Sequence, residues 1–455
     1  MKHWTALQVA DAAGARLIAA PPVGGGPVTA TVDSRQAGDG SLFVGLTGVN
    51  ADGGQFASAA LVKGAWGVLV SPQHAERAAM AGMGTVLAAD DPLRSLQRLA
   101  TAWRRELRTG GARLIGVTGS TGKTSTKDLL LAVLAPHRRT VASRANFNTE
   151  IGLPLEILNA PAETEVLVLE MGMRGRGQIA ELARIAEPDV GVIVSIGPVH
   201  LELLGSVEAI AAAKAELIAG LPVGATAVVP AGERLLEPHL RDDVTIVTFG
   251  DGGDVHLAVG DEHHVEVAAA GARIDLEVPF TQAHLRSNLL AAVAAARAVG
   301  VTPAGRVELT LTSGRGQRRE LPGGLTVIDD CYNANPMSML AALRDLETTT
   351  AARDGTRRIA VLGDMLELGP QEREFHAELG EQAAAAGVDV LVTVGPLAAA
   401  SAARFHGESH SVADAGEAAA LVPQLLQPGD VVLVKGSRAV GLELVCTALG
   451  ARDDT

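Results

Sequence analysis

The chain has 455 residues, which at roughly 150 residues per domain corresponds to about three domains with cores of their own. Hydrophobic residues make up 47% and charged residues 20%, and no uncharged apolar run reaches the roughly 18 residues of a membrane helix. The net charge of −14 opposes binding to nucleic acid and to anionic lipid surfaces, and two cysteines are too few for a disulfide framework. We therefore expect a cytoplasmic protein that neither inserts into membranes nor binds nucleic acid. We also expect a monomer.

Composition and patterning divide the chain into three regions. Residues 1–90 mix short apolar runs with turn residues and predict a small α/β domain. In residues 91–313, strand-like runs alternate with helices, as in βαβ units on a doubly wound parallel sheet, and short alternating strands between 245 and 279 predict a small β-rich appendage. Residues 314–455 repeat strand then helix and predict a second, Rossmann-like sheet. The polar stretch 313–317 is the expected hinge.

Several elements can be predicted within these regions. Asp91 followed by Pro92 predicts the N-cap and first turn of a helix that opens the second region. Further strands are predicted at 114–117, 166–169, 190–196, 325–328, 359–362, 390–394 and 431–434, and further helices at 125–134, 207–217 and 284–299.

The strongest local motif is the glycine-rich stretch 116–124, which lies between a predicted strand and a predicted helix. Backbone N–H groups of such a loop surround phosphate oxygens, Lys123 would reach the terminal phosphates, and the Thr124 hydroxyl would ligate Mg²⁺. Val117 stands where the usual first glycine falls, and a ligand-free glycine turn is the alternative. Kinases, motors, GTPases and ligases share this loop, so alone it predicts only a nucleoside triphosphate. The predicted nucleotide-binding residues here are Gly119, Ser120, Thr121, Gly122, Lys123, Thr124 and Ser125.

Three further residues narrow the chemistry. Glu170 ends a predicted buried strand, so we expect it beside the phosphate loop as a second Mg²⁺ ligand, or else paired with a nearby arginine. His200 follows the next strand, although a lone histidine is more often structural. Lys214 lies fourteen residues later on a predicted helix, where a solvated charge is the usual interpretation.

Taken together, these residues resemble the Mur ligases, the ATP-dependent amide-bond-forming enzymes of bacterial cell-wall synthesis. The resemblance covers nearly the whole chain, and the motifs occur in the family's order. Within the family, the stretches 329–336 and 362–369 and the N-terminal Asp33-Ser34-Arg35 are similar to the member that adds D-alanyl-D-alanine, and the Asp-Asn-Pro-Arg motif of the diaminopimelate-adding member is absent.

The resemblance implies a three-domain enzyme that uses ATP and Mg²⁺. ATP would phosphorylate the C-terminal carboxylate of UDP-N-acetylmuramoyl-tripeptide, and the amine of D-alanyl-D-alanine would attack the acyl phosphate. It implies catalytic roles for Lys123, Glu170, His200 and Lys214, with Thr124, Glu170, His200 and Lys214, the last as a carbamate, holding metal. It implies that the first domain binds the UDP-sugar and that the third closes over ATP and binds the incoming amine.

Further residues are assigned by the same resemblance. Those implied to hold nucleotide are Asn288, Arg319, Asp330, Asn333 and Asn335, and Arg319 is the preferred phosphate contact because its guanidinium suits paired oxygens. Those implied to bind the other substrates are Ser34, Arg35, Phe43, Asn146, Asn148, Thr149, Lys435 and Ser437.

The sequence departs from the family pattern at two places. Gly54 and Thr149 stand where the family often has His and Asn, in stretches used for the nucleotide-sugar substrate. The remaining alternatives are another Mur-type ligase, or a P-loop kinase or nucleotide-dependent switch.

Overall fold

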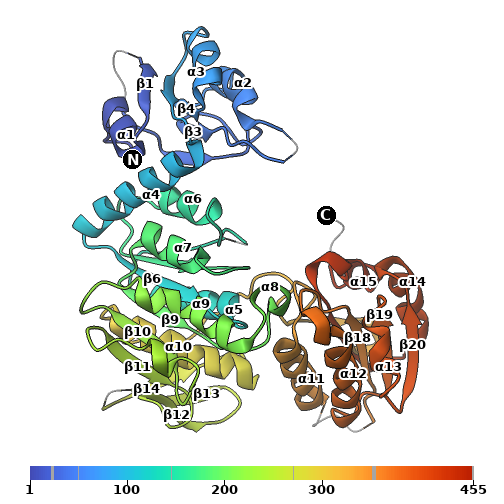
Figure 1. Ribbon diagram of the computed structural model, residues 1–455. Coiled ribbons are helices and arrows are strands. Elements are labelled where there is room, and N and C mark those ends of the chain that lie inside the picture. The colour runs from blue at the N-terminus through green and yellow to red at the C-terminus, as the bar shows by residue number, and fades with distance from the viewer. Residues whose placement is uncertain (22–24, 50, 145, 270, 351–354, 453–455) are drawn as a thin grey trace.

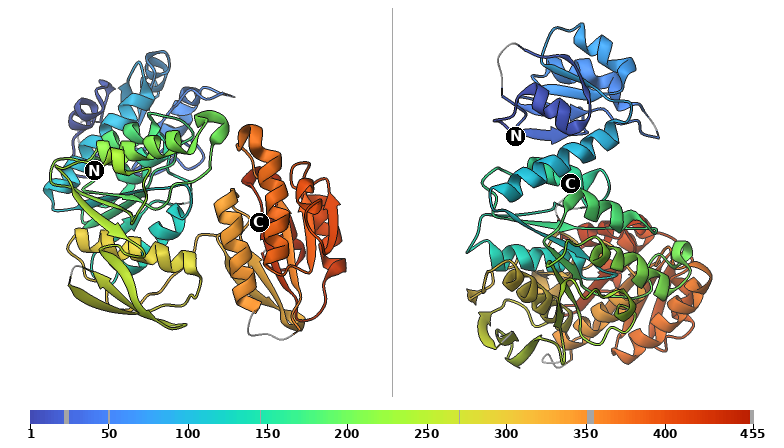
Figure 2. Two further views of the ribbon diagram at one scale, coloured as in Figure 1. Left: turned by 60° about the horizontal axis from the view of Figure 1, so that its bottom comes forward. Right: turned by 60° about the vertical axis from the view of Figure 1, so that its left-hand side comes forward.

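The computed structural model describes residues 1–21, 25–49, 51–144, 146–269, 271–350 and 355–452. Three α/β units, each built on its own sheet, follow one another along the chain (Figure 1). The N-terminal unit lies above the central one, and the C-terminal unit lies beside the central one rather than in line with it. Figure 2 shows the same arrangement from two other directions. The three-domain α/β class expected from the sequence is confirmed.

The N-terminal unit is a five-stranded sheet in the order β1-β5-β4-β3-β2, parallel except where β1 pairs with β5. Its strands are β1 Arg16–Ala19, β2 Thr29–Thr31, β3 Ser41–Val44, β4 Gly67–Val70 and β5 Thr85–Ala88, and its helices are α1 Ala6–Ala13, α2 Ala57–Val62 and α3 Pro72–Ala79, with a 3-10 turn at Gly53–Phe56.

Alternation along these strands gives the sheet two apolar faces. Phe43 and Val68 pack in a core that belongs to the N-terminal unit alone. Leu42 and Leu69, on the other face, join a larger core that continues through the central unit as far as Leu217. The first domain is therefore packed against the second by a continuous apolar core, not attached by a linker.

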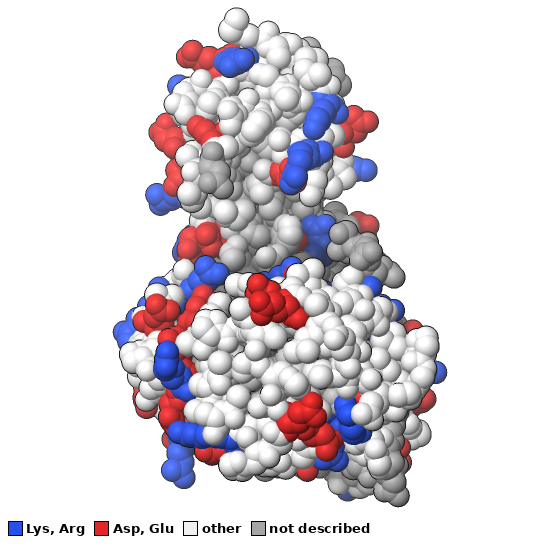
Figure 3. Space-filling view, turned by 90° about the vertical axis from the view of Figure 1, so that its right-hand side faces the viewer, with Lys and Arg blue, Asp and Glu red and all other residues white. Residues whose placement is uncertain are grey.

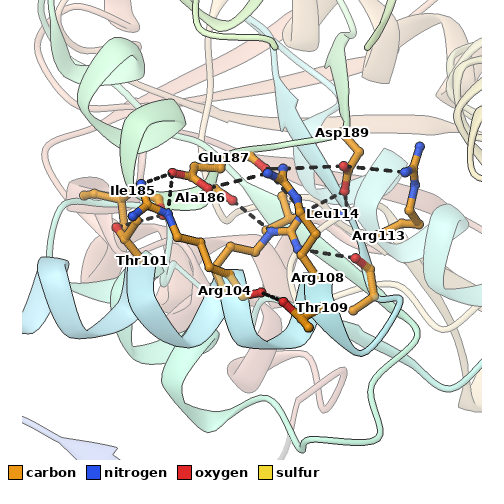
Figure 4. Close-up of polar contacts among 12 residues, drawn as sticks. Thr101, Arg104, Arg108, Thr109, Arg113, Leu114, Ile185, Ala186, Glu187 and Asp189 are labelled. Atoms are coloured by element: carbon orange, nitrogen blue, oxygen red, sulfur yellow. Dashed lines mark hydrogen bonds and ion pairs between the residues drawn. The ribbon is translucent and has the colours of Figure 1, made fainter. Parts of the chain in front are cut away.

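Helix α4 (Pro92–Thr109) joins the two units. Asp91 caps it by accepting a hydrogen bond from the Arg94 N–H at 2.9 Å, as the sequence predicts. The buried Arg104 guanidinium forms an ion pair with Asp189 at 2.6 Å and donates to backbone carbonyls, and Arg108 joins the same network (Figure 4). These bonds satisfy a charge that burial would otherwise penalise.

The central unit is a ten-stranded sheet in the order β15-β14-β13-β12-β11-β10-β9-β6-β8-β7. Its strands are β6 Arg113–Thr118, β7 Thr140–Ala142, β8 Val166–Glu170, β9 Val190–Ile193, β10 Thr226–Pro230, β11 Thr245–Phe249, β12 Val255–Gly260, β13 His264–Ala269, β14 Ala272–Glu277 and β15 Gly305–Arg306. Its helices are α5 Lys123–Leu134, α6 Gly152–Asn159, α7 Gln178–Ala186, α8 Leu201–Leu204, α9 Val207–Ala219 and α10 Ala283–Ala298, with a 3-10 turn at Glu237–His239.

The predicted β-rich appendage is part of this sheet. Strands β12, β13 and β14 pair antiparallel to one another, and Phe249 of β11 pairs with Val255 of β12. The alternating pattern between 245 and 279 therefore marks a change from parallel to antiparallel pairing within one sheet.

The C-terminal unit is a six-stranded sheet in the order β16-β17-β21-β18-β19-β20, parallel except at β16. Its strands are β16 Gln317–Leu321, β17 Leu325–Asp329, β18 Arg358–Gly363, β19 Val390–Val394, β20 Glu408–Val412 and β21 Val431–Lys435. Its helices are α11 Pro336–Thr350, α12 Glu372–Ala385, α13 Ala399–Ala402, α14 Ala415–Leu425 and α15 Glu443–Ala448, with 3-10 turns at Pro322–Gly324, Gly369–Gln371 and Arg438–Val440.

The expected hinge at 313–317 is held by hydrogen bonds to its surroundings. The Gly316 N–H donates to the Asp329 carbonyl at 2.8 Å, and the Tyr332 N–H donates to the Gly314 carbonyl at 3.1 Å. Gln317 begins β16 and donates from its side chain to the Leu311 carbonyl at 2.8 Å. The segment is therefore fixed to the third sheet at its C-terminal end.

The side of the molecule that presents the C-terminal unit carries charges of both signs, scattered among uncharged residues (Figure 3). None of the helices in the described part of the chain combines the length and apolar character that crossing a bilayer requires.

Candidate functional site: a phosphate loop facing the C-terminal domain

The glycine-rich loop lies between β6 and α5, as its sequence context predicts. Gly122 caps α5 with a left-handed backbone (φ 79°), and a Cβ there would lie 2.7 Å from the Asn288 Oδ1 atom. Only glycine satisfies both conditions. The loop leaves α5 with free N-terminal N–H groups, which form an anion-binding site.

Lys123 is the first residue of α5, and its amine donates to the Gly119 carbonyl at 2.8 Å. Burial lowers the pKa of Lys123, the Glu170 carboxylate opposes that shift, and the Arg315 guanidinium adds to it. The lysine thus folds back over its own loop, where its charge would face a bound phosphate.

Glu170, at the end of β8, lies beside the loop. The Thr124 hydroxyl donates to its Oε2 at 2.8 Å, and the Asn148 amide donates to its Oε1 at 2.8 Å. The alternative was an ion pair between Glu170 and a nearby arginine, and no such pair is present among the described residues. A hydroxyl and a carboxylate side by side are hard oxygen donors of the kind that Mg²⁺ prefers.

Burial lowers the pKa of both His200 and Lys214. The Glu367 carboxylate opposes this shift at His200, and the charge of Lys123 adds to the lowering at both residues. The Lys214 side chain is buried on α9, and no described residue gives its amine a hydrogen bond or an ion pair. A solvated-charge role for Lys214 is therefore wrong. Because the amine is desolvated, its pKa falls well below the usual value, which favours its neutral form.

A cavity of about 330 Å³ extends from the loop to the C-terminal unit. The central unit contributes Ser120 to Ser125 and Asn288, and the C-terminal unit contributes Asp330, Asn333, Asn335 and Lys435. Lys435 is buried and forms an ion pair with Asp330 at 2.6 Å while donating to the Asn333 carbonyl at 3.1 Å. Its charge is thus already neutralised at the cavity wall.

Arg315 lines this cavity, whereas Arg319 does not. The Arg315 guanidinium lies 4.1 Å over the Tyr332 ring, and its buried Nε has no hydrogen-bond partner among the described residues. Arg319 lies exposed on β16. Sequence reasoning identified the segment around Arg315 only as a hinge, although an arginine between two glycines at a domain boundary was the available signal.

The remaining candidates lie away from the cavity. Phe43 is fully buried in the N-terminal core, so its side chain cannot contact a ligand there. Arg35 is 88% exposed and binds Asp33 at 2.8 Å through its guanidinium, which lowers the pKa of that carboxyl. Ser34 offers its carbonyl to the Lys63 amine at 2.9 Å. The Ser437 hydroxyl accepts from the Leu366 N–H at 3.0 Å and so supports a loop.

Asn146 and Thr149 follow β7 on an exposed turn. Thr149 accepts from the Gly152 N–H at 3.4 Å at the start of α6. Of this stretch, Asn148 alone reaches the loop site, through Glu170.

Known proteins share both this fold and this arrangement of motifs. Residues 117–296 match the Mur ligase middle domain, and residues 314–438 match the Mur ligase, glutamate ligase domain. The UDP-N-acetylmuramoyl-tripeptide–D-alanyl-D-alanine ligase of Synechocystis is 37% identical over 435 residues, 93% of this chain and 92% of the relative.

Two solved structures extend the similarity. MurF from Acinetobacter baumannii superposes with a TM-score of 0.86 at 27% identity, covering 99% of each chain. MurF ligase from Thermotoga maritima in complex with ADP superposes with a TM-score of 0.79 at 30% identity, covering 93% of this chain and 97% of that one. The chain therefore belongs to the Mur ligase family and, within it, groups with the UDP-N-acetylmuramoyl-tripeptide–D-alanyl-D-alanine ligases.

Proposed function

We propose that the chain is an ATP-dependent ligase that joins D-alanyl-D-alanine to UDP-N-acetylmuramoyl-tripeptide for peptidoglycan synthesis. The observation that carries the proposal is the grouping of Glu170 and the unpaired Lys214 around Lys123 and Thr124, two loop residues that line a cavity shared by two domains. The Synechocystis relative, which is named for this activity, aligns with 93% of the chain.

The chemistry has two steps. The tripeptide carboxylate attacks the γ-phosphate of ATP, which gives an acyl phosphate and ADP. The dipeptide amine then attacks the acyl carbon, phosphate leaves, and the attacking nitrogen loses a proton. Because the first step brings two anions together, charge neutralisation and alignment dominate catalysis. Lys123 supplies that charge at the loop, and Arg315 supplies it from the C-terminal unit.

Thr124 and Glu170 would hold Mg²⁺, since they present oxygen donors next to the loop. When bound, this ion neutralises phosphate charge. Lys214 fits a metal site only in another chemical form, because an ammonium repels a cation. A neutral amine that adds CO₂ through a new N–C bond and releases one proton to solvent becomes an anionic carbamate, and burial of Lys214 favours the neutral amine that this reaction needs. Lys214 would then share metal with His200.

The domain roles follow the same proposal. The N-terminal domain would bind the UDP-sugar through the exposed Arg35, and the turn at Asn146 and Thr149 would add contacts from the central domain. The C-terminal domain would close over ATP and receive the amine substrate, with Ser437 supporting that site through its loop. We also propose, as expected from the sequence, that the enzyme acts as a monomer in the cytoplasm.

Mass-spectrometric detection of the pentapeptide product tests the proposal. The enzyme is incubated with ATP, Mg²⁺, UDP-N-acetylmuramoyl-tripeptide and D-alanyl-D-alanine, and each component is omitted in turn. Lys123→Ala should lose about a hundredfold in turnover, since one such electrostatic contact contributes about 3 kcal/mol. Lys2→Ala, an exposed lysine at the N-terminus, is the control. Phosphate release that needs neither the tripeptide nor the dipeptide would contradict a ligase.

A further inference from the structure

The central and C-terminal domains meet at a contact that neither the loop nor the cavity includes. His200, the N-cap of α8, forms a hydrogen bond through its Nδ1 with Oε2 of Glu367, which lies between β18 and the turn at Gly369–Gln371. The Glu202 N–H donates to the Glu367 carbonyl at 3.3 Å, and Arg174 lies 3.8 Å from the other carboxylate oxygen. In Figure 1, α8 lies on the side of the central unit that faces the C-terminal unit.

Both residues of the contact have unusual backbones. The φ angles of His200 and Glu367 are 54° and 64°, and Glu187 is the one other non-glycine residue in the described ranges with a positive φ. An N-cap residue normally has an extended backbone, and left-handed conformations cost free energy for side chains of this size. Two such residues in direct contact are a feature that the surrounding structure must hold in place.

The C-terminal domain holds Glu367 through the loop that precedes it. The neutral His376 ring donates from Nδ1 to the Glu372 carbonyl at 2.6 Å and accepts at Nε2 from the Met365 N–H at 2.8 Å. The Ser437 hydroxyl accepts from the next N–H, that of Leu366. These hydrogen bonds therefore fix the position of the loop that carries Glu367.

We propose that Glu367 is a positioning residue, which fixes the tautomer and ring orientation of His200 and does so only when the C-terminal domain is docked. This inference rests on the proposed function, which makes His200 part of the metal site. With Nδ1 donating to the carboxylate, Nε2 keeps its lone pair for a cation, the arrangement by which carboxylates orient metal-binding histidines. The partner comes from another domain, so docking and metal binding are coupled.

Two variants test the role of the carboxylate. Glu367→Gly removes it while suiting the left-handed backbone, and Glu367→Gln keeps the side chain's size but removes its charge. Glu374→Gln, an exposed carboxylate on α12 that pairs with Arg404, is the matched control. Protein labelled with ¹⁵N at its 12 histidines reports the tautomer by NMR, and a His200→Gln spectrum identifies the signal.

The parent and Glu374→Gln should show His200 protonated at Nδ1 alone, whereas Glu367→Gly should show both tautomers. Mn²⁺, measured by electron paramagnetic resonance in the presence of a non-hydrolysable ATP analogue, should bind the Glu367 variants roughly tenfold more weakly. If Glu367→Gly does not fold, Glu367→Ala, which also lacks an acceptor for Nδ1, takes its place in both measurements.

An unchanged tautomer, or Mn²⁺ affinity within about twofold of the parent, would overturn the inference. Neither measurement uses the peptide substrates. The parent enzyme could form no amide product while the Glu367 variants still change the His200 tautomer and weaken Mn²⁺ binding. That result would refute the proposed function but not the positioning role.

Discussion

At the scale of single residues, the most direct test concerns Lys214. Its buried amine has no described partner, so Lys214→Ala breaks no described hydrogen bond, leaves a space where the side chain lay, and would remove the proposed carbamate. We expect the variant to lose most of its activity and to regain part of it when formate or acetate fills the space. Turnover measured against formate concentration checks this.

Lys214→Arg is the matched comparison. Its bulk and permanent charge occupy the space, so added formate should not restore its activity. Full activity of Lys214→Ala without any added anion would refute the carbamate role. Lys2 is exposed in the N-terminal unit, away from Lys214, so Lys2→Ala should respond to formate as the parent does.

Single residues also show where sequence reasoning succeeds. Lys123, Thr124 and Glu170 were predictable because each lies at the start or the end of an element whose sequence pattern is unambiguous. Arg315 was not, since its role depends on the position of Tyr332 and on two domains meeting. Arg319 was favoured for its chemistry, but alternation along β16 places it away from the cavity.

At the scale of elements, the loop between β18 and α12 should depend on pH. Burial holds the pKa of His376 below its usual value in the folded protein, so below about pH 6.5 the unfolded chain binds more protons than the folded one. The stability that neutral His376 contributes is therefore present above that pH and lost as the pH falls.

His376→Gln should reduce this dependence, because its amide oxygen accepts the Met365 N–H without titrating. Melting temperatures at pH 7.5 and pH 5.5 provide the measurement. The parent should lose more stability than the variant on acidification, and equal losses would show that protonation of His376 does not matter. His200 and His284, whose pKa values desolvation also lowers, are present in both proteins and contribute alike.

Four of the strands that the sequence missed lie at the edges of their sheets. Strands β16 and β20 are the two edges of the C-terminal sheet, and β7 and β15 are the two edges of the central sheet. Interior strands of a parallel sheet are buried on both faces and read as apolar runs, as in 166–169 and 390–394. Edge strands such as 408–412 are largely polar, so their sequences resemble loops.

At the scale of the whole molecule, nucleotide should draw two domains together. Lys123 and Arg315 face the same cavity from different domains, and the positive charge of Arg315 lowers the pKa of Lys123. A triphosphate between them would replace repulsion with two attractions. We expect a non-hydrolysable ATP analogue with Mg²⁺ to decrease the radius of gyration in small-angle X-ray scattering.

Arg315→Ala should weaken this compaction, because the C-terminal domain then loses its cation at the phosphate. If the radius of gyration of the parent does not change when the nucleotide is added, the prediction that nucleotide draws the two domains together is wrong. The exposed Arg319→Ala is the control, and it should compact as the parent does.

The arrangement of domains was the part least accessible from sequence. The order of motifs predicted three α/β units, but the contact of His200 with Glu367 joins residues 167 positions apart. Neither residue type nor spacing signals such a contact, since it depends on how two finished domains dock.

The apolar core shared by the first two domains has a consequence for biosynthesis. One face of the N-terminal sheet is covered by α4 and α6, and the Ala30 N–H and carbonyl both bond to the Asn159 side chain, 129 residues later. At about 5–20 residues per second, the ribosome takes about 6 to 26 seconds to make that stretch. During those seconds the nascent domain exposes an apolar sheet face, which makes this interval the one in which a chaperone would most usefully bind it.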